Sequence, residues 1–578
     1  MKKLLPHKYY PWLLTVLFGL AVFLFWKLRY PFALTYQEQL QLFLFDGDYF
    51  CDRMVEPGGF ARYVAEFLVQ FYNGVTIGAV IIALLYMLVQ RLTWRLMSTA
   101  NHPLSIIHYP LSFIPVVMLW FAMGDESVML TYVVALAMAL AVTVGLRRVM
   151  RDRRVSRVIR WGGVILLIPV LYWLIGPMVL LVAVLMLPWT VAVAAVVYAL
   201  ALMLLSAHFL PFPMMRVMLG VSYYRIPVTM PYILMAIPLV IVLLTWICRR
   251  FPTILESKKQ WLFVGESLVV AIVGILIVPR GFDAKKYELI EYDYLVRIQD
   301  WNGIIAKADK QMPDLPMSVS ATNLALGMTN QLGERAFDFF QHGSEGLLPK
   351  FERNFATTQL TGEIYFYLGL VNTAQRFAFE AMEAIPNYNK SARVVKRLAE
   401  TNLINGEYDV ARKYLRMLEK TVFYRPWAQR TIAMLGDEKA IDAHPLYGTM
   451  RQNRLQEDFL FSERELDKIC GQLFLHNHQN QMAAQYLLMM PLMDRDILRF
   501  MQYVQVVQNH IQYNPRHVQE GIAFAFMQQR QQPPRGLLSQ FMMQQMNDFM
   551  QTYGSGGKNA PELERFRNTV WYYLTVGK

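Results

Sequence analysis

Residues 161–206 read WGGVILLIPVLYWLIGPMVLLVAVLMLPWTVAVAAVVYALALMLLS and contain no charged side chain. A helix needs about 20 consecutive apolar residues to cross a bilayer, so this stretch is long enough for more than one crossing. The whole chain shows the same bias, because 55% of its 578 residues are hydrophobic and only 17% are charged. Soluble globular domains carry about 25% charged residues. The sequence therefore predicts an integral membrane protein.

Other apolar runs of spanning length lie on both sides of this stretch, at about 12–28, 73–90, 107–123, 127–146, 231–248 and 261–278. Within the stretch itself, Pro169, Pro177 and Pro188 mark places where a helix ends or kinks. They divide it into two or three passages. The first domain, residues 1–283, is therefore expected to hold about eight or nine spans.

Basic residues in the loops indicate which side of the membrane each loop occupies. Seven arginines lie between Arg147 and Arg160, and the loop 249–260 carries four more basic residues. Loops rich in Lys and Arg stay in the cytoplasm, although such a block would also suit an anionic-lipid or phosphate site. If both loops are cytoplasmic, residues 161–206 make three passages, the span count is nine, and everything after Arg280 is external. With two passages the last domain would be cytoplasmic.

The two halves of the chain differ in charge. Residues 1–283 hold 23 Lys and Arg against 12 Asp and Glu, a balance of +11, whereas the remainder holds 33 against 31, a balance of +2. The basic excess belongs to the apolar half and agrees with positive loops between spans. A nucleic-acid-binding protein would instead carry this excess on a folded, exposed face. The charge pattern therefore argues against nucleic acid as a partner.

Residues 284–578 form a second domain, in which amphipathic helices of about 12–15 residues alternate with short turns that contain Gly or Asn. The clearest unit is residues 392–426, where Asn405-Gly406 joins two helices and Tyr408 begins the second. This unit resembles the tetratricopeptide repeat. The resemblance implies an α-solenoid with a concave surface for a peptide or protein partner. The alternative is that the repeats only form a rigid cap for the membrane domain.

The motifs of common soluble enzymes, such as the P-loop, GxGxxG, GxSxG and HExxH, do not occur in the sequence. The richest polar segment is the first loop, residues 30–72, which is external if the N-terminus is cytoplasmic. Its charged residues include Glu38, Asp46, Asp48, Asp52, Arg53, Glu56, Arg62 and Glu66. We expect two interfacial helices there, at Gln39–Phe45 and Phe60–Phe71, on either side of the turn Pro57-Gly58-Gly59.

This loop is similar to the first external loop of polytopic glycosyltransferases of the GT-C type, which use sugars linked to polyprenyl phosphate. In those enzymes an acidic residue near the end of the first span is followed by interfacial helices, and some carry a tetratricopeptide domain. The resemblance covers the first 280 residues as architecture and residues 36–72 as pattern. It implies Glu38 as the catalytic acidic residue, with Asp46 or Asp48 as alternatives. The chain departs from the family in having no acidic pair directly after the first span.

Two roles are open for a carboxylate at this position. It would accept a proton from an acceptor hydroxyl, or it would hold a divalent cation against the phosphate of the donor. The sequence does not decide between a base and a metal ligand. Arginines at the same depth are candidates to bind that phosphate or a lipid headgroup, namely Arg216, Arg225 and Arg280. The alternative is an ordinary acidic external loop with arginines that reach towards the headgroups.

The segments FDGDYF (45–50) and EPGGFARY (56–63) also resemble a family of bacterial multi-spanning membrane proteins with a helical C-terminal domain and no assigned activity. That resemblance implies a bacterial inner membrane and lipid neighbours. Three functions stay open: a glycosyl or glycan transferase at the external face, a non-enzymatic scaffold or assembly factor that binds a protein, and a transporter. The expected fold is the same in each case, an all-α polytopic bundle followed by a tetratricopeptide-like α-solenoid.

Overall fold

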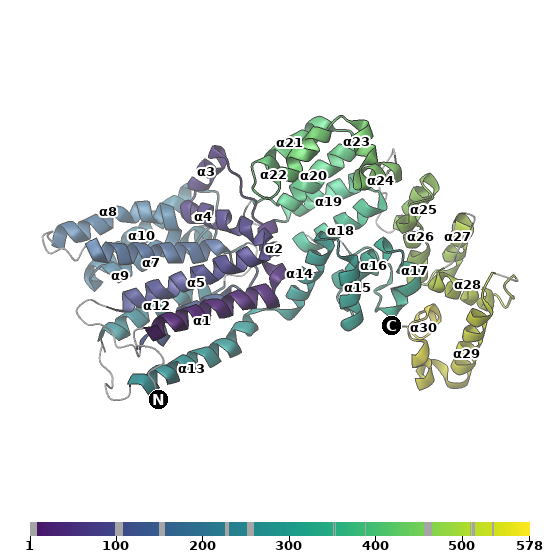
Figure 1. The fold of residues 1–578 in the computed structure, drawn as a ribbon, viewed down its shortest axis with the longest axis horizontal. Coiled ribbons are helices and arrows are strands. Elements are labelled where there is room, and N and C mark those ends of the chain that lie inside the picture. Colours follow the sequence, from purple (N-terminus) through teal and green to yellow (C-terminus); the bar gives the residue numbers. More distant parts are fainter. Residues whose placement is uncertain are drawn as a thin grey trace. The chain divides into compact units, whose positions relative to one another are not determined.

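The chain divides into two compact units, shown in Figure 1. The computed structural model describes residues 9–98, 108–149, 157–225, 231–250, 259–350, 352, 354–385, 387, 389–455, 465–508, 510, 515–534 and 537–577. Unit 1 comprises Met1–Tyr287 with the short segments Pro386–Ser391 and Lys420–Phe423, and unit 2 comprises the rest. The first boundary falls inside one helix, α14 (Ala284–Arg297).

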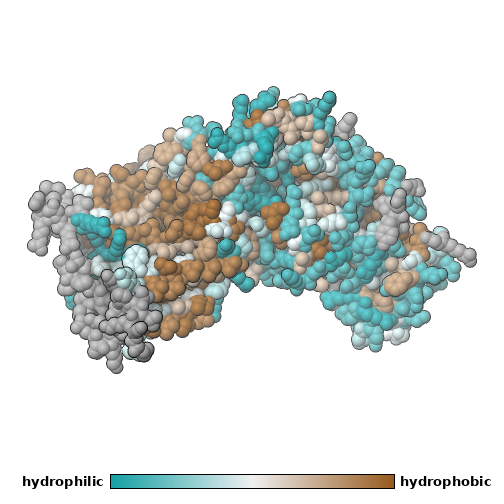
Figure 2. All heavy atoms as spheres, in the orientation of Figure 1, coloured by the Kyte–Doolittle hydropathy of each residue, from teal (hydrophilic) through white to brown (hydrophobic). Residues whose placement is uncertain are grey.

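The described residues form helices, as expected, and their only β-type pairing is an isolated antiparallel bridge between Val128 and Tyr224. Figure 2 shows mainly hydrophobic residues over the face of unit 1 in view and mainly hydrophilic residues over that of unit 2. Exposed apolar surfaces of this extent mark contact with a membrane or with another protein.

Seven helical stretches in the described part of the chain are long and apolar enough to cross a membrane. They are Tyr10–Arg29 (α1, Tyr10–Leu24, with the π-helix after it), Val75–Met97 (α5), Leu130–Arg148 (in α7, Leu130–Val149), Trp161–Met186 (from α8, Arg157–Ile175, to α9, Val179–Met186), Trp189–Phe209 (α10), Ile233–Arg250 (α12) and Trp261–Gly281 (from α13, Lys259–Ile277). A shorter apolar stretch covers Pro110–Ala122 and ends in α6 (Ile114–Ala122). These stretches are compatible with a membrane-embedded protein.

Residues 161–206, where three passages are expected, form three helices, α8, α9 and α10. Only two stretches there reach spanning length, because Pro177 and Pro188 bracket α9 and limit it to eight residues. Proline lacks the amide hydrogen that a helix interior requires, so helices end near it. Pro169, in contrast, lies inside α8.

One end of unit 1 is held by arginines, and we call it the arginine end. The guanidinium of Arg147 donates to the carbonyl oxygens of Leu96 (2.8 Å) and Leu185 (3.0 Å), and Arg249 donates to Leu96 as well (3.2 Å). Leu185 lies near the end of α9, which follows a chain reversal at Gly176, where φ is 63°. The short helix α9 therefore leads back towards the arginine end.

The opposite end, which we call the loop end, gathers the segments that connect the spans there. The first loop reaches α8, where the amide of Gly58 donates to the carbonyl of Trp173 (2.8 Å). The bridge described above joins the segment before α7 to the one after α11 (Met214–Leu219). The start of α14 lies at the same end, because the hydroxyl of Tyr287 donates to the carbonyl of Gly124 (3.0 Å).

The first loop forms three short helices, α2 (Pro31–Gln39), α3 (Gly47–Met54) and α4 (Gly59–Val69). The helix expected at Gln39–Phe45 is wrong, since residues 41–46 have no regular structure. The backbone there bonds elsewhere in unit 1: the amide of Leu42 donates to the carbonyl of Lys390 (2.9 Å), and that of Phe45 to the carbonyl of Lys420 (2.8 Å). These partners lie far away in the sequence, so local periodicity did not indicate them.

The turn before α4 depends on two glycines. Gly58 has a φ of 81°, and a Cβ atom there would lie 3.2 Å from the amide nitrogen of Gly176. A Cβ atom on Gly59 would lie 1.9 Å from the carbonyl oxygen of Arg53. Only glycine allows this backbone conformation and this close approach without strain. The predicted turn is confirmed, and α4 begins directly after it.

Unit 2 consists of helices that pack largely on their neighbours in sequence. They are α15 (Trp301–Lys310), α16 (Pro316–Met328), α17 (Leu332–Arg335), α18 (Phe355–Leu368), α19 (Val371–Glu383), α20 (Ala392–Asn405), α21 (Tyr408–Glu419), α22 (Arg425–Met434), α23 (Glu438–Ala443), α24 (Pro445–Asn453), α25 (Leu466–His476), α26 (Gln481–Met493), α27 (Ile497–Gln508), α28 (Arg516–Gln528), α29 (Gln540–Gly556) and α30 (Val570–Thr575). Helix α18 packs on α19, α20 on α21, and α25 on α26. The turn between α20 and α21 is at Gly406, where φ is 83°.

Candidate functional site

Helix α4 carries two charged side chains into the interior of unit 1. The helix packs on α7 and α8, and its small residues Ala61 and Ala65 are fully buried. Arg62 and Glu66 are buried as well, with 4% and 0% of their surface exposed. Their i,i+4 spacing places the two side chains next to each other, and the Nε of Arg62 donates to Glu66 at 2.9 Å.

Glu66 accepts three hydrogen bonds. Besides Arg62, the donors are the Nε of Arg53 (2.7 Å) and the hydroxyl of Tyr49 (2.5 Å), both from α3. Burial favours the neutral acid, but the attraction of Arg62 and Arg53 and the hydrogen bond from Tyr49 outweigh it and lower the pKa of Glu66. Glu66 is therefore an ionised carboxylate whose oxygens are occupied.

Arg62 connects α4 to other parts of unit 1. Its Nη1 donates to Glu56 (2.7 Å), and its Nη2 donates to the side-chain oxygen of Asn389 (2.5 Å). Glu56 also accepts from the hydroxyl of Ser222 (2.9 Å). Burial opposes the charge of Arg62, but attraction to Glu66 and Glu56 exceeds that effect and raises the pKa of the guanidinium.

A second buried arginine lies beside this group. Arg216, on α11, donates to the carbonyl oxygens of Val221 (2.9 Å) and Tyr224 and to the side-chain oxygen of Asn387 (2.8 Å). Asn387 in turn donates to the carbonyl of Tyr224 (3.2 Å). Burial lowers the pKa of Arg216, and its Nη1 has no hydrogen-bond partner among the described residues.

We call these residues together the ion network, which comprises Tyr49, Arg53, Glu56, Arg62, Glu66, Arg216, Ser222, Asn387 and Asn389. A buried charge costs several kcal/mol unless it is paired and hydrogen-bonded. The network therefore fixes the conformation of the loop end. Because its carboxylates are enclosed and bound to cations, they are suited to holding structure rather than to exchanging protons with a substrate.

The three predicted catalytic carboxylates differ in burial and in ion pairing. Glu38 is buried on α2, with only 4% of its surface exposed. Asp46 precedes α3 and forms an ion pair with Lys420 (2.5 Å), whose hydrogen bond lowers the pKa of Asp46. Asp48 is exposed in the first turn of α3. No group of three or more His, Cys, Asp and Glu side chains in the described residues could hold a metal ion.

The predicted phosphate-binding arginines also have separate environments. Arg216 belongs to the ion network. Arg225 is buried near the segment before α7, where its Nη1 donates to the carbonyl of Glu126 (2.7 Å). Arg280 is exposed after α13, and its Nη1 donates to the carbonyl of Leu276 (2.9 Å).

Sequence reasoning did not select the central residues of the network, although Glu56, Arg62 and Glu66 were among the charged residues of the first loop. The signal that could have found them is an Arg–Glu pair at i,i+4 spacing on an otherwise apolar helix. Asn387, Asn389 and Ser222 carried no comparable signal, because their roles depend on long-range contacts.

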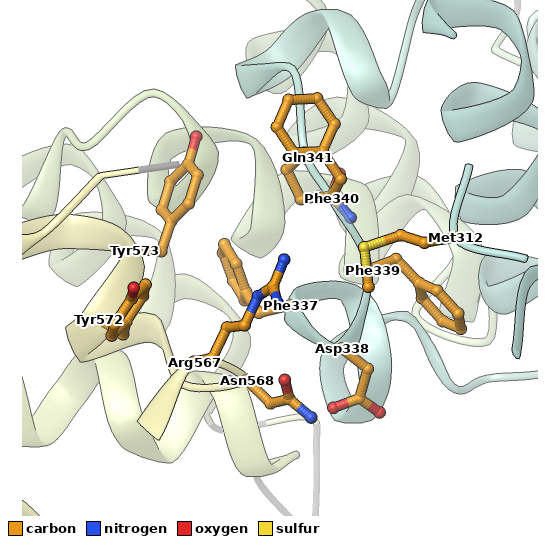
Figure 3. A pocket seen from close by; sticks show the side chains of 10 residues that line it. All are labelled: Met312, Phe337, Asp338, Phe339, Phe340, Gln341, Arg567, Asn568, Tyr572 and Tyr573. Atoms are coloured by element: carbon orange, nitrogen blue, oxygen red, sulfur yellow. The ribbon is translucent and has the colours of Figure 1, made fainter. Parts of the chain in front are cut away.

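A small crevice in unit 2 has a different character. It is lined by Met312 between α15 and α16, by the segment after α17 and by the segment around the start of α30, and its volume is about 40 Å³. Figure 3 shows its lining residues, which are Met312, Phe337, Asp338, Phe339, Phe340, Gln341, Arg567, Asn568, Tyr572 and Tyr573. Half of them are aromatic, so the crevice offers apolar walls with a few polar groups.

Arg567 is the unpaired cation of this crevice. It is exposed, forms no ion pair with any of the described residues, and points into the crevice in Figure 3. The nearby carboxylate of Asp338 is already bound by Arg335 (3.3 Å) and lies 3.6 Å from Arg516. The crevice therefore has an excess of positive charge that the protein does not neutralise.

The chain was compared with known protein families, curated proteins and solved structures. The sequence profile of a family described as a family of unknown function (DUF6057) matches residues 8–577. No curated protein and no solved structure matches the chain.

We predict that Glu66→Gln destabilises the protein by about 3–5 kcal/mol, because it leaves Arg62 and Arg53 buried without their shared anion. Urea unfolding of the full chain in mild detergent measures this loss. Asp46→Asn is the matched control, since it removes an ion pair at the partly exposed Lys420, and we expect it to change stability little. Equal effects of the two substitutions would contradict a structural role of the network.

Proposed function

The chain belongs to DUF6057, a family of unknown function, and we propose that it is a membrane-anchored scaffold that recruits a partner protein. The observation that carries the proposal is the unpaired Arg567 in the aromatic crevice of unit 2. The charges of the first loop, in contrast, are largely bound to one another. We interpret α18 to α26 as a tetratricopeptide-like solenoid, a type of fold that presents extended surfaces to partners.

The chemistry of the crevice indicates what the partner presents. An arginine fork binds a carboxylate through two parallel hydrogen bonds, and rings such as those of Phe337 and Tyr573 supply apolar contact. A volume of about 40 Å³ has room for a carboxylate, whereas pockets for small-molecule ligands measure about 300–1,000 Å³. We infer that the partner presents an Asp or Glu side chain next to an aromatic or aliphatic one.

We further propose that unit 1 lies in a bacterial inner membrane with its arginine end in the cytoplasm. Arg147 and Arg249 lie at that end, and basic residues favour the cytoplasmic side. Residues 150–156 of the predicted basic block 147–160 and residues 251–258 lie outside the described residues. On this orientation the loop end and the start of α14 are external, which makes unit 2 external too.

A transferase is the second candidate, and one observation favours it. Glu38 is buried on α2, the helix that follows the first span, at the position that the resemblance to GT-C glycosyltransferases gives to the catalytic acidic residue. A carboxylate enclosed at that depth is able to act as a base on an acceptor hydroxyl, with a polyprenyl-phosphate-linked sugar as donor. Asp46 is a weaker candidate for this role because Lys420 binds it.

The scaffold proposal predicts the peptides that the chain selects. Peptides selected from a random display library on the full chain in nanodiscs are expected to be enriched in an acidic residue beside an aromatic one. Arg567→Gln is expected to weaken binding of a selected peptide at least 10-fold, because a charged hydrogen bond contributes about 1.5–3 kcal/mol. Arg565→Gln removes an exposed cation outside the crevice and serves as control. Selection without acidic enrichment, or equal binding by both variants, would contradict the proposal.

The transferase candidate predicts that Glu38→Gln lowers sugar transfer from a polyprenyl-phosphate donor at least 100-fold, the usual effect of removing a general base. Release of polyprenyl phosphate in proteoliposomes measures the rate. Asp48→Asn, at an exposed position on the same loop, is expected to leave the rate unchanged. If the wild-type chain transfers no sugar, or if the Glu38→Gln variant is as active as the wild type, this candidate is excluded.

The orientation predicts which cysteine reacts from outside. Cys51 is exposed on α3, whereas Cys248 and Cys470 are buried. A membrane-impermeant maleimide is expected to label the protein in intact spheroplasts, and Cys51→Ser is expected to abolish the label. If labelling requires lysis, the loop end faces the cytoplasm and the proposed orientation is reversed.

A further inference from the structure

The span that contains α13 is the least enclosed of the seven. Only 6% of it is buried inside the protein, compared with 61% for the span in α7. Helix α13 packs on α6 and on the 3₁₀ turn Pro110–Phe113 before α6. Between α1, α6 and α13 lies a cavity of about 500 Å³.

The walls of this cavity are almost entirely apolar. They include Phe18 from α1, Phe25 from the π-helix after it, Trp120 from α6, and Ala271 and Gly274 from α13. The volume lies within the range of about 300–1,000 Å³ that is typical of ligand sites. A second helix, about 10 Å across with its side chains, is too thick for such a space, whereas a hydrocarbon chain is one methylene wide.

The cavity extends towards the loop end. The aromatic ring of Trp120, in its wall, lies 5.0 Å from that of Phe25, the first residue after α1. The lining of the same cavity includes Val278 and Pro279, which follow α13.

Three exposed cations follow the cavity-lining residues of the two chain segments at the loop end. Lys27 and Arg29 follow Phe25 at the end of the first span, and Arg280 follows α13. The two chain segments are held together there, because the rings of Phe25 and Phe282 lie 5.1 Å apart. None of the three cations forms an ion pair with a described residue.

We propose that this cavity binds one anionic phospholipid. The acyl chain lies between α1 and α13, and the phosphate lies among Lys27, Arg29 and Arg280. The apolar cavity accounts for the acyl chain, and the cations account for the charge of the headgroup. This site is separate from the crevice of unit 2, so it does not rest on the scaffold function.

Native mass spectrometry of the full chain tests the proposal with two probes of equal chain length, phosphatidylglycerol and phosphatidylcholine. We expect about one phosphatidylglycerol to be retained per chain. Its retention is expected to exceed that of phosphatidylcholine at least 10-fold, because a hydrogen bond to a charged group favours the anionic headgroup by about this factor. Replacement of Lys27, Arg29 and Arg280 by Gln is expected to reduce that preference to about 2-fold or less, because the charges that distinguish the headgroups are gone.

Two glycine variants on α13 provide a matched pair for the cavity itself. A Cβ atom on Gly274 would lie 3.8 Å from Val117 in the cavity wall, so Gly274→Leu fills the space. A Cβ atom on Gly265 would meet nothing within 4 Å, and that residue does not line the cavity. We expect Gly274→Leu to lower retention at least 10-fold and Gly265→Leu to leave it unchanged. Equal retention of both lipids by the wild type, or no loss in Gly274→Leu, would overturn the proposal.

Discussion

Arg62 carries a positive charge into the interior of unit 1, where the free energy of an unpaired charge is prohibitive. Glu66 lies one turn along α4, Glu56 lies in the turn before it, and both must stay ionised and close for the charge to be stable. Asn389 and Ser222 occupy the remaining hydrogen-bonding positions of this group. The position of α4, and through it that of α3 and of the segment after α11, follows from this requirement.

This use of charge bears on function. Where charged side chains neutralise one another, as Arg62 and Glu66 do, they stabilise the protein and have few hydrogen-bonding positions left for a ligand. Where a cation has no anionic partner in the protein, as at Arg567 and at the end of α13, it is available to bind an anionic ligand. Both of these places combine the cation with apolar walls. The two proposed ligands therefore share a chemistry, an anionic group attached to an apolar one.

The sequence was a good guide to features with local causes. Apolar runs predicted the long helices, and the turn before α4 was predicted because Gly58 and Gly59 adopt conformations that other residues avoid. It was a poor guide where the cause lies far away. The segment 41–46 looked helical, yet its backbone bonds to Lys390 and Lys420. The candidate carboxylates were chosen by position, and their partners, such as Lys420 for Asp46, could not be predicted from spacing.

Hydrogen exchange on the full chain tests the central role of Arg62 most directly. The substitution Arg62→Met keeps the length of the side chain and removes its charge. If Arg62 holds the loop end together, amides of residues 47–69 and of residues 214–225 lose protection in the same variant, while those of α20 and α21 do not change. Loss of protection confined to α4 would contradict the account, because Arg62 would then stabilise only its own helix.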